Sequence, residues 1–297
     1  MSARPATQRP PSKPVIKEPV WTWEIPFYFY TGGLAGAAAG LARLAEARGD
    51  DVLARRASDI AFAGAAASPA LLISDLGRPE RFLHMLRLFK VTSPMSVGSW
   101  ILAAFGSAVG AGWLDHLTGG RVPGGRAART AAGVLGLPLS SYTAVLVANT
   151  AVPAWHESRR ILPFVFVAGA AASAGAAVMA LTPPRHAGPA RRLALAGAVA
   201  EVGLATLMER RLGPLSDAYS RDKFATASKT LLAAGAAAGL GAARSRPAAV
   251  AAGALITAGA VLARWSIFRA GFRSAADPMH TIGPQRDRSA AASAPAR

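Results

Sequence analysis

Eight apolar blocks, most of them long enough to cross a lipid bilayer, recur along this chain and are separated by short segments rich in Arg. The hydrocarbon core of a bilayer is about 30 Å thick, and a helix rising about 1.5 Å per residue needs roughly 20 apolar residues to cross it. The blocks run approximately over residues 25–42, 60–76, 96–114, 131–152, 161–182, 193–208, 228–243 and 248–268.

Lipid restricts what such blocks can form, because a backbone group in the bilayer core must find its hydrogen-bond partner within the protein. Only helices and closed barrels meet that condition, and the alternating ten-residue strands of a barrel do not occur in this sequence. The sequence therefore predicts an all-α membrane protein with about eight transmembrane helices. The blocks at 193–208 and 228–243 are the least apolar, since Ala and Gly contribute little to insertion.

The charge of the chain is explained by its loops rather than by nucleic-acid binding. The formal net charge is +17, but the basic residues lie in loops and tails, where positive charge orients membrane helices. No basic face on a soluble fold exists to hold nucleic acid. The chain has no Cys, which excludes disulfides, thiolate-bound zinc and cysteine-ligated iron–sulfur clusters within it. We expect no metal site.

Three regions are predicted along the chain. These are a basic, Pro-rich N-terminal arm without regular structure at 1–20, a polytopic helical membrane domain at 21–272, and a polar C-terminal tail at 273–297. The arm has no apolar core with a cleavage site, so the first membrane helix is expected to act as an uncleaved insertion signal.

The distribution of Lys and Arg predicts the orientation. Basic residues are more numerous in the two tails and alternate loops than in the remaining loops, so we expect both termini in the cytoplasm. The excess of Ala, and of Arg over Lys, is typical of a GC-rich bacterial genome. The bacterial inner membrane is therefore the expected location.

Small residues at a four-residue spacing predict close contacts between helices. The pairs and triplets in question are Gly32 with Gly36 and Gly40, Gly106 with Gly110, and Gly235 with Gly239. A compact bundle is expected, although Ala and Gly enrichment alone also produces such spacings by chance.

A polar connector, DLGRPERFLHMLRLFK, separates the second and third apolar blocks. Pro79 can occupy the first turn of a helix. Apolar residues then recur at helical spacing, at Phe82, Leu83, Leu86 and Phe89, beside the basic residues Arg78, Arg81, Arg87 and Lys90. This pattern is typical of a short amphipathic helix in the membrane interface. A binding surface for a partner protein is the alternative.

At this point the sequence resembles a known family. The stretches WTWEIPFYFYTGGLAG at 21–36, DLGRPERF followed by SPMSVGSW, and RWSIFRAGFRSAADP at 264–278 occur in the order seen in the NrfD-like family. These are the integral membrane subunits of polysulfide reductase and related molybdoenzyme complexes. The resemblance covers nearly the whole chain.

The resemblance implies a fold, partners and a substrate. It implies eight helices arranged as two four-helix bundles, which anchor a ferredoxin-like iron–sulfur subunit and, through it, a molybdopterin catalytic subunit. Electrons would pass between that partner and the quinone pool of the membrane, most commonly menaquinone. The resemblance also implies no haem in this subunit, and no turnover of the soluble substrate by this chain alone.

The histidines give an independent prediction about haem. A bis-histidine haem needs two His that face each other from within helices. The five His of the chain all fall in connectors, helix ends or the tail, at positions 84, 116, 156, 186 and 280. The sequence itself therefore argues against a haem-b anchor.

A quinone site needs an apolar slot and polar groups near the two carbonyl oxygens. Glu24 and Tyr28 lie at the start of the first helix, and the resemblance implies that Glu24 matches a polar quinone contact of the family. Tyr142, inside the fourth block, is a third candidate, because a buried phenol needs a hydrogen-bond partner. The alternatives are an interfacial aromatic belt at the start of the first helix, which does not readily explain Glu24, and an ordinary core position for Tyr142.

Asp75, Arg78 and Arg81 lie in and after the DLGRP turn. Asp75 and Arg78 are expected to cap helices, by pairing with each other or with backbone groups. The resemblance adds a role for this turn in shaping the surface that faces the iron–sulfur partner.

Glu201 lies in the middle of the sixth block, where an ionisable group is costly unless it is paired, hydrated or neutral. A carboxyl on a proton path, or half of an ion pair with a residue such as Lys229, would explain it. A kinked or shallow helix that exposes Glu201 to water is the alternative.

Two other functions stay open at this stage. A proton-coupled secondary transporter would use Glu201, but such proteins often carry internal repeats, and the sequence shows no convincing one. A purely structural anchor without a quinone site is the third possibility.

Overall fold

The computed structural model describes residues 15–78, 80–243 and 245–282, and within these ranges the chain is helical without strands. Eight helices are long, and each overlaps one predicted apolar block. They are α1 (Glu24–Ala47), α2 (Asp51–Asp75), α4 (Pro94–Leu117), α5 (Gly125–Ala148), α7 (Leu162–Leu181), α8 (Gly188–Arg211), α10 (Lys223–Gly241) and α11 (Arg246–Ala276). Four short helices connect them: α3 (Glu80–Met85), α6 (Pro153–Glu157), the 3₁₀ turn η1 (Gly213–Ser216) and α9 (Asp217–Ser220). The predicted all-α fold is confirmed.

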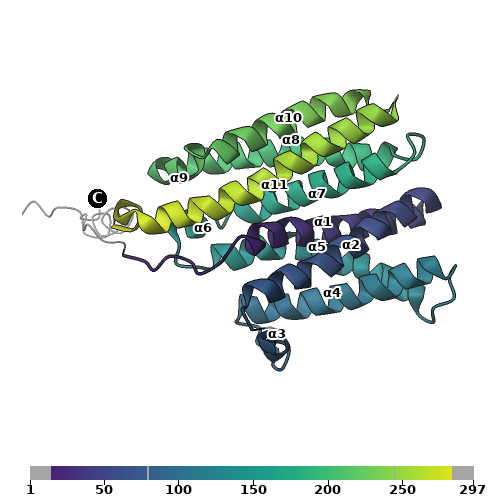
Figure 1. Cartoon of the computed structure of the whole chain (residues 1–297), viewed down its shortest axis with the longest axis horizontal. Coiled ribbons are helices and arrows are strands. Elements are labelled where there is room, and N and C mark those ends of the chain that lie inside the picture. The colour runs from purple at the N-terminus through teal and green to yellow at the C-terminus, as the bar shows by residue number, and fades with distance from the viewer. Residues whose placement is uncertain (1–14, 79, 244, 283–297) are drawn as a thin grey trace, which may run out of the picture.

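The long helices form two four-helix bundles, as the family resemblance implied. Helices α1, α2, α4 and α5 make the first ring of contacts, and α7, α8, α10 and α11 make the second. The two bundles meet mainly through α1 and α5, which pack against α7, while α1 also touches α11. Figure 1 shows the bundles side by side with their helices nearly parallel.

The two bundles repeat the same order and direction of helices. The short elements α3, α6 and α9 all lie at one end of the molecule, which we call the connector end (Figure 1). The connections at 48–50, 118–124 and 182–187 lie at the other end, the hairpin end, where α10 also ends and α11 begins. This internal repeat was not recognisable in the sequence, because Ala- and Gly-rich helices can pack alike without sharing a motif.

Five of the long helices, α2, α4, α5, α7 and α11, are long and apolar enough to cross a membrane. Together with the composition, they identify a multi-pass membrane protein. Helices α1, α8 and α10 are also long, but they are not among these five apolar helices. Helix α8, for example, carries charged residues at both ends and Glu201 between them. The count of eight spans therefore stays a prediction.

The predicted region boundaries differ slightly from the helices. Helix α11 runs to Ala276, past the boundary expected at 272. Residues 1–14 of the predicted N-terminal arm and 283–297 of the predicted tail lie outside the described residues.

Close helix contacts occur at some of the predicted glycines. A Cβ on Gly36 of α1 would collide with the carbonyl oxygen of Gly136 on α5, and the converse holds. On α10, a Cβ on Gly235 would meet Ile256 of α11, and one on Gly239 would meet Leu195 of α8. At Gly40, Gly106 and Gly110 the same test finds no atom within 4 Å, so the predicted contact was wrong there.

We expect Gly136→Ala to destabilise the first bundle by about 1–3 kcal/mol, because the added methyl forces α1 and α5 apart at their closest approach. Gly110→Ala is the matched control: open space surrounds Gly110, and Ala favours the helix by about 0.5–1 kcal/mol. Thermal unfolding of the detergent-purified variants measures both. Equal midpoints for Gly136→Ala and the unmodified chain would contradict the close packing.

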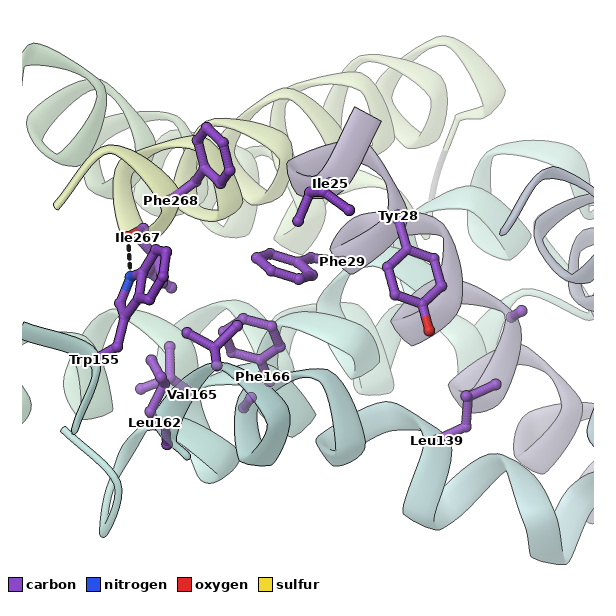
Figure 2. Close-up of a cluster of buried hydrophobic side chains, with 14 of the residues drawn as sticks. Ile25, Tyr28, Phe29, Leu139, Trp155, Leu162, Val165, Phe166, Ile267 and Phe268 are labelled. Carbon is purple, nitrogen blue, oxygen red and sulfur yellow. Dashed lines mark hydrogen bonds between the residues drawn. The ribbon is translucent and has the colours of Figure 1, made fainter. Parts of the chain in front are cut away.

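An aromatic cluster joins the bundles at the connector end (Figure 2). The Trp155 side chain is fully buried, and its Nε1 donates a 2.8 Å hydrogen bond to the carbonyl oxygen of Ile267. Phe29 of α1 meets Phe166 of α7 with ring centroids 5.6 Å apart. In Figure 2, Phe29 points into this cluster while the preceding residue, Tyr28, points away from it. Tyr28 is thereby directed into the interior of the first bundle.

Candidate functional site

A pocket with about 80 Å³ of free volume lies at the connector end of the first bundle, between α1, α2, α4 and α5. We call it the tyrosine pocket. Its walls are mostly apolar, and the chemistry-bearing side chains that line it are Tyr28, Tyr142, Asp75 and Ser99, with Trp21 and Met85 from the segments outside the long helices. The pocket therefore brings together Tyr28 of α1 and Tyr142, which lies more than a hundred residues later in the chain.

Tyr28 and Tyr142 enter the pocket from different helices, and both are buried. Neither phenol oxygen forms a hydrogen bond with any residue that the structure describes. A buried hydroxyl normally finds a partner, so two free phenols in one apolar pocket are suited to a ligand with two acceptor atoms. Of the predicted quinone candidates, the structure brings these two together.

Gly98 fixes the position of Tyr142. A Cβ built on Gly98, in the first turns of α4, would overlap the phenol ring of Tyr142. This glycine lies in the SPMSVGSW stretch, where the sequence alone predicts no role for it. The Tyr142 ring packs directly on the backbone of Gly98. No pattern in the sequence around Gly98 predicts this contact, because Tyr142 lies on another helix.

Glu24 lies behind the pocket rather than on its wall. The Thr22 backbone N–H and Oγ1 donate to Asp75 Oδ1 over 3.0 and 2.8 Å. The Thr22 hydroxyl also contacts Glu24 Oε2, and Ser74 Oγ donates to Glu24 Oε1 over 3.3 Å. We call Thr22, Glu24, Ser74 and Asp75 the carboxylate rim. Because Asp75 lines the tyrosine pocket, the Thr22 hydroxyl connects the pocket to Glu24.

Asp75 therefore accepts hydrogen bonds from Thr22, which precedes α1, and not from the helix ends that it was expected to cap. Within the described chain it makes no ion pair with Arg78. Arg78 and Arg81 are exposed on the connector and do not line the tyrosine pocket. Their predicted role at a partner surface is compatible with that exposure but is not tested by it.

The connector is helical for a shorter stretch than predicted. Helix α3 ends at Met85, so Leu86 and Phe89 do not continue one helical face. Ser96 closes the loop that follows: its Oγ accepts from the Lys90 N–H and donates to the Leu88 carbonyl oxygen, both over 3.0 Å. Pro79 lies outside the described residues. The large apolar side chains left exposed are Leu83, Leu88, Phe89 and Val91.

Glu201 is buried and paired, but not with the predicted residue. Its Oε1 lies 3.3 Å from Arg264 NH1, and both side chains are almost completely buried. Arg264 also donates to the Phe166 carbonyl oxygen over 3.2 Å and stacks on the Phe166 ring. Lys229 instead pairs with Glu209, at 2.5 Å. The prediction of a buried ion pair is correct, and Lys229 as its partner is wrong.

Gly169 makes room for this pair, since a Cβ there would collide with both Arg264 and Glu201. Arg264 was not predicted as a partner of Glu201, although it belongs to the RWSIFRAGFRSAADP stretch. Its position inside the last apolar block was the signal that a second ionisable group lies deep in the bundle.

A second charged cluster was missed altogether, at the hairpin end of the first bundle. Glu46 Oε1 lies 3.0 Å from His116 Nε2 and 2.6 Å from Arg129 Nε, and Arg129 also pairs with Asp115. These four residues come from α1, α4 and α5, so the cluster ties three helices together. It marks the end of the bundle opposite to the tyrosine pocket.

Comparison with known proteins gives one family match. The family model NrfD_2, described as polysulfide reductase, matches residues 14–276. No curated protein matches the chain. The matched region contains the tyrosine pocket, the connector and the Glu201–Arg264 pair.

Proposed function

Because this chain belongs to the NrfD-type polysulfide reductase family, it is a membrane subunit of an oxidoreductase complex, and we propose that it binds quinone and quinol in the tyrosine pocket. The observation that carries the proposal is the pair of buried, unpartnered phenols in one apolar pocket. A quinone ring is apolar with two carbonyl oxygens, so it matches both properties of the pocket. Menaquinone is the expected form.

The two tyrosines would orient the ring. Each phenol O–H donates to one carbonyl oxygen, which stabilises the negative charge that develops there during reduction. The rigid seat of Tyr142 on Gly98 holds one donor in place before the ligand arrives. The side chains of Ile25, Phe29 and Leu102 supply the apolar walls.

The carboxylate rim would handle protons. Reduction of one quinone to quinol consumes two electrons and two protons, and oxidation releases them. Asp75 touches the pocket, and Thr22 connects it to Glu24, so a proton can pass between the pocket and the connector-end surface by this route. Neither tyrosine needs to lose its own proton.

The electrons would come from, or go to, a partner. This chain has no Cys to hold an iron–sulfur cluster, so we assign that role to a ferredoxin-like subunit, itself attached to a molybdopterin catalytic subunit. The connector, with exposed Arg78 and Arg81 beside exposed Leu88 and Phe89, is the proposed contact surface. Met85 of the same connector lines the tyrosine pocket, which keeps the proposed electron path short.

We propose the bacterial inner membrane as the location, with both termini in the cytoplasm. The excess of Lys and Arg in the tails supports this orientation. The connector end, where the described chain begins and α11 ends, would then face the cytoplasm (Figure 1).

The phenols can be tested directly in the complex isolated through a tag on this chain, with mass spectrometry identifying its partners. We expect Tyr28→Phe and Tyr142→Phe each to lower quinone-dependent turnover about tenfold, because each loses one hydrogen bond to the substrate. Tyr30→Phe is the matched control: it lies on the same helix but packs against the second bundle. Unchanged turnover in both pocket variants would exclude this site and leave a purely structural anchor.

Proton-coupled transport is a second candidate, favoured by two observations. A buried Glu201–Arg264 pair and a parallel internal repeat both occur in secondary transporters. A chain that is purified without any redox partner and moves a solute with protons in vesicles would support it over the quinone role.

A further inference from the structure

The second bundle contains its own pocket at the place that corresponds to the tyrosine pocket. This pocket, with about 30 Å³ of free volume, lies between α8, α10 and α11 at the connector end, and we call it the glutamate pocket. In the internal repeat, α8, α10 and α11 correspond to α2, α4 and α5. Both pockets lie against the same parts of these helices: the second half of α2 or α8, the start of α4 or α10, and the second half of α5 or α11. Tyr219 of α9 bounds the glutamate pocket from outside the long helices.

A single buried carboxyl forms the deep end of the glutamate pocket. Glu201 lines the pocket, and its Oε2 has no hydrogen-bond partner among the described residues. The charged groups that face Glu201 are Arg264 from α11 and the Lys229–Glu209 pair from α10 and α8, with Tyr30 of α1 next to Arg264. Helix α7 contributes only Gly169 and the Phe166 ring and carbonyl. One carboxylate oxygen of this pocket-lining residue therefore has neither a hydrogen bond nor an ion pair within the described chain.

The mouth of the glutamate pocket reaches water. Glu209 and Lys229 line it near the connector end, and their side chains keep 15% and 30% of their surface exposed. The pocket has polar partners at both ends and enough room for water molecules, which is what buried water requires. Tyr219 does not relay protons to Glu201. Its hydroxyl donates a hydrogen bond to the Ala154 carbonyl oxygen, and burial raises the pKa of its phenol.

On the hairpin side of Glu201 the bundle is dry. The buried residues there are Ala172, Ala176, Ala194, Ala198, Ile256 and Ala260. Gly197 and Gly175 bring α7 and α8 into backbone contact, and the Ser173 hydroxyl is used by the carbonyl of its own helix at Gly169. Tyr30, beside Arg264, reaches Ser173 and Thr257 on this side. Beyond these three residues, neither a polar side chain nor a pocket in this stretch of the described chain continues the path.

We infer that Glu201 exchanges its proton with one face of the membrane only, the connector face, through the glutamate pocket. A water molecule in the pocket gives a proton to the free Oε2, the carboxylate becomes a carboxylic acid, and bulk water past Glu209 and Lys229 replaces the proton. Release reverses these steps. The second bundle is thus a proton reservoir closed at the hairpin end and not a transmembrane proton path. The inference goes beyond the quinone role and does not require it.

The absence of native Cys allows a clean test by single-cysteine substitution in the full chain. A charged, membrane-impermeant methanethiosulfonate is added to one face or the other of membrane vesicles that contain the complex. It reacts only with thiolate, which forms only where water reaches the sulfur. Ala205→Cys and Ala225→Cys report on the glutamate pocket, and Ala172→Cys and Ala194→Cys report on the dry side. Leu88→Cys marks the connector face and Arg121→Cys the hairpin face.

We expect the two pocket cysteines to be labelled only from the face that labels Leu88→Cys, and about tenfold faster than the two dry-side cysteines. Labelling of Ala172→Cys or Ala194→Cys from the Arg121→Cys face would reveal a path through the bundle and overturn the inference. So would pocket cysteines that stay unlabelled while Leu88→Cys reacts. Two cysteines on each side keep the comparison valid if one variant misfolds, and the result is independent of quinone turnover.

Discussion

Gly98→Ala is expected to lower quinone-dependent turnover about hundredfold, because it displaces the Tyr142 phenol by about an ångström or more within the tyrosine pocket. The Cβ of Ala would occupy the space that the Tyr142 ring fills. The ring must rotate into the pocket, or α4 must move away from α5. In either case, the donor no longer lies where the carbonyl oxygen of the quinone would be.

The control lies on the same helix. Gly106 has no atom within 4 Å of an added Cβ, so Gly106→Ala should leave turnover unchanged. Steady-state kinetics of the purified complex with a water-soluble quinone analogue measures both variants. Normal turnover in Gly98→Ala would mean that Tyr142 does not orient the substrate.

A double substitution separates packing from chemistry. Gly98→Ala combined with Tyr142→Leu removes the ring that clashes with the added methyl group. The double variant should therefore unfold at a higher temperature than Gly98→Ala alone, while its quinone-dependent turnover stays low. Recovery of both would show that the pocket tolerates the loss of the phenol, and the proposed role of Tyr142 would fail.

Arg264→Met is expected to destabilise the protein by about 3–5 kcal/mol, because it leaves the Glu201 carboxyl buried without its partner. Both side chains are nearly fully enclosed, so solvent cannot replace the lost interaction. The variant also loses the hydrogen bond to the Phe166 carbonyl oxygen and the stacking on its ring. Thermal unfolding of the detergent-purified chain measures the effect.

The double variant Glu201→Leu/Arg264→Met should recover most of this stability, since an apolar pair of similar volume needs no compensation in the interior. Lys229→Met gives the comparison at a wetter pair, and there we expect about 1 kcal/mol or less, because Lys229 and Glu209 are partly exposed. If Arg264→Met cost no more than Lys229→Met, the deep pair would not be the structural unit described here.

The fold was predictable in its class and in the positions of its helices. Apolar blocks of transmembrane length allow only one regular structure in lipid, and all eight blocks correspond to long helices. Hydropathy cannot distinguish a helix that crosses the membrane from one that lies among other helices. Helix α8, with Glu201 inside it, shows why the number of spans was not fixed.

The candidate site was predictable only in part. Tyr28 and Tyr142 could be selected as buried phenols, but their meeting in one pocket depends on the packing of α1, α4 and α5. The role of Gly98 cannot be recognised from its sequence neighbours, because Gly98 acts by having no side chain at the place where the Tyr142 ring of α5 packs. Glu201 required a partner, yet the sequence could not choose between Lys229 and Arg264, which lie on different helices that both face it.

The parallel repeat has an evolutionary consequence. A unit of four membrane helices returns the chain to the face where it began, so a tandem gene duplication adds a second copy in the same orientation without any change of topology signals. Each copy then keeps a pocket at the same face, and the two can diverge independently. In this chain one copy carries paired phenols and the other a paired acid and base, which is the division expected when one half keeps an ancestral ligand site and the other is free to acquire a different task.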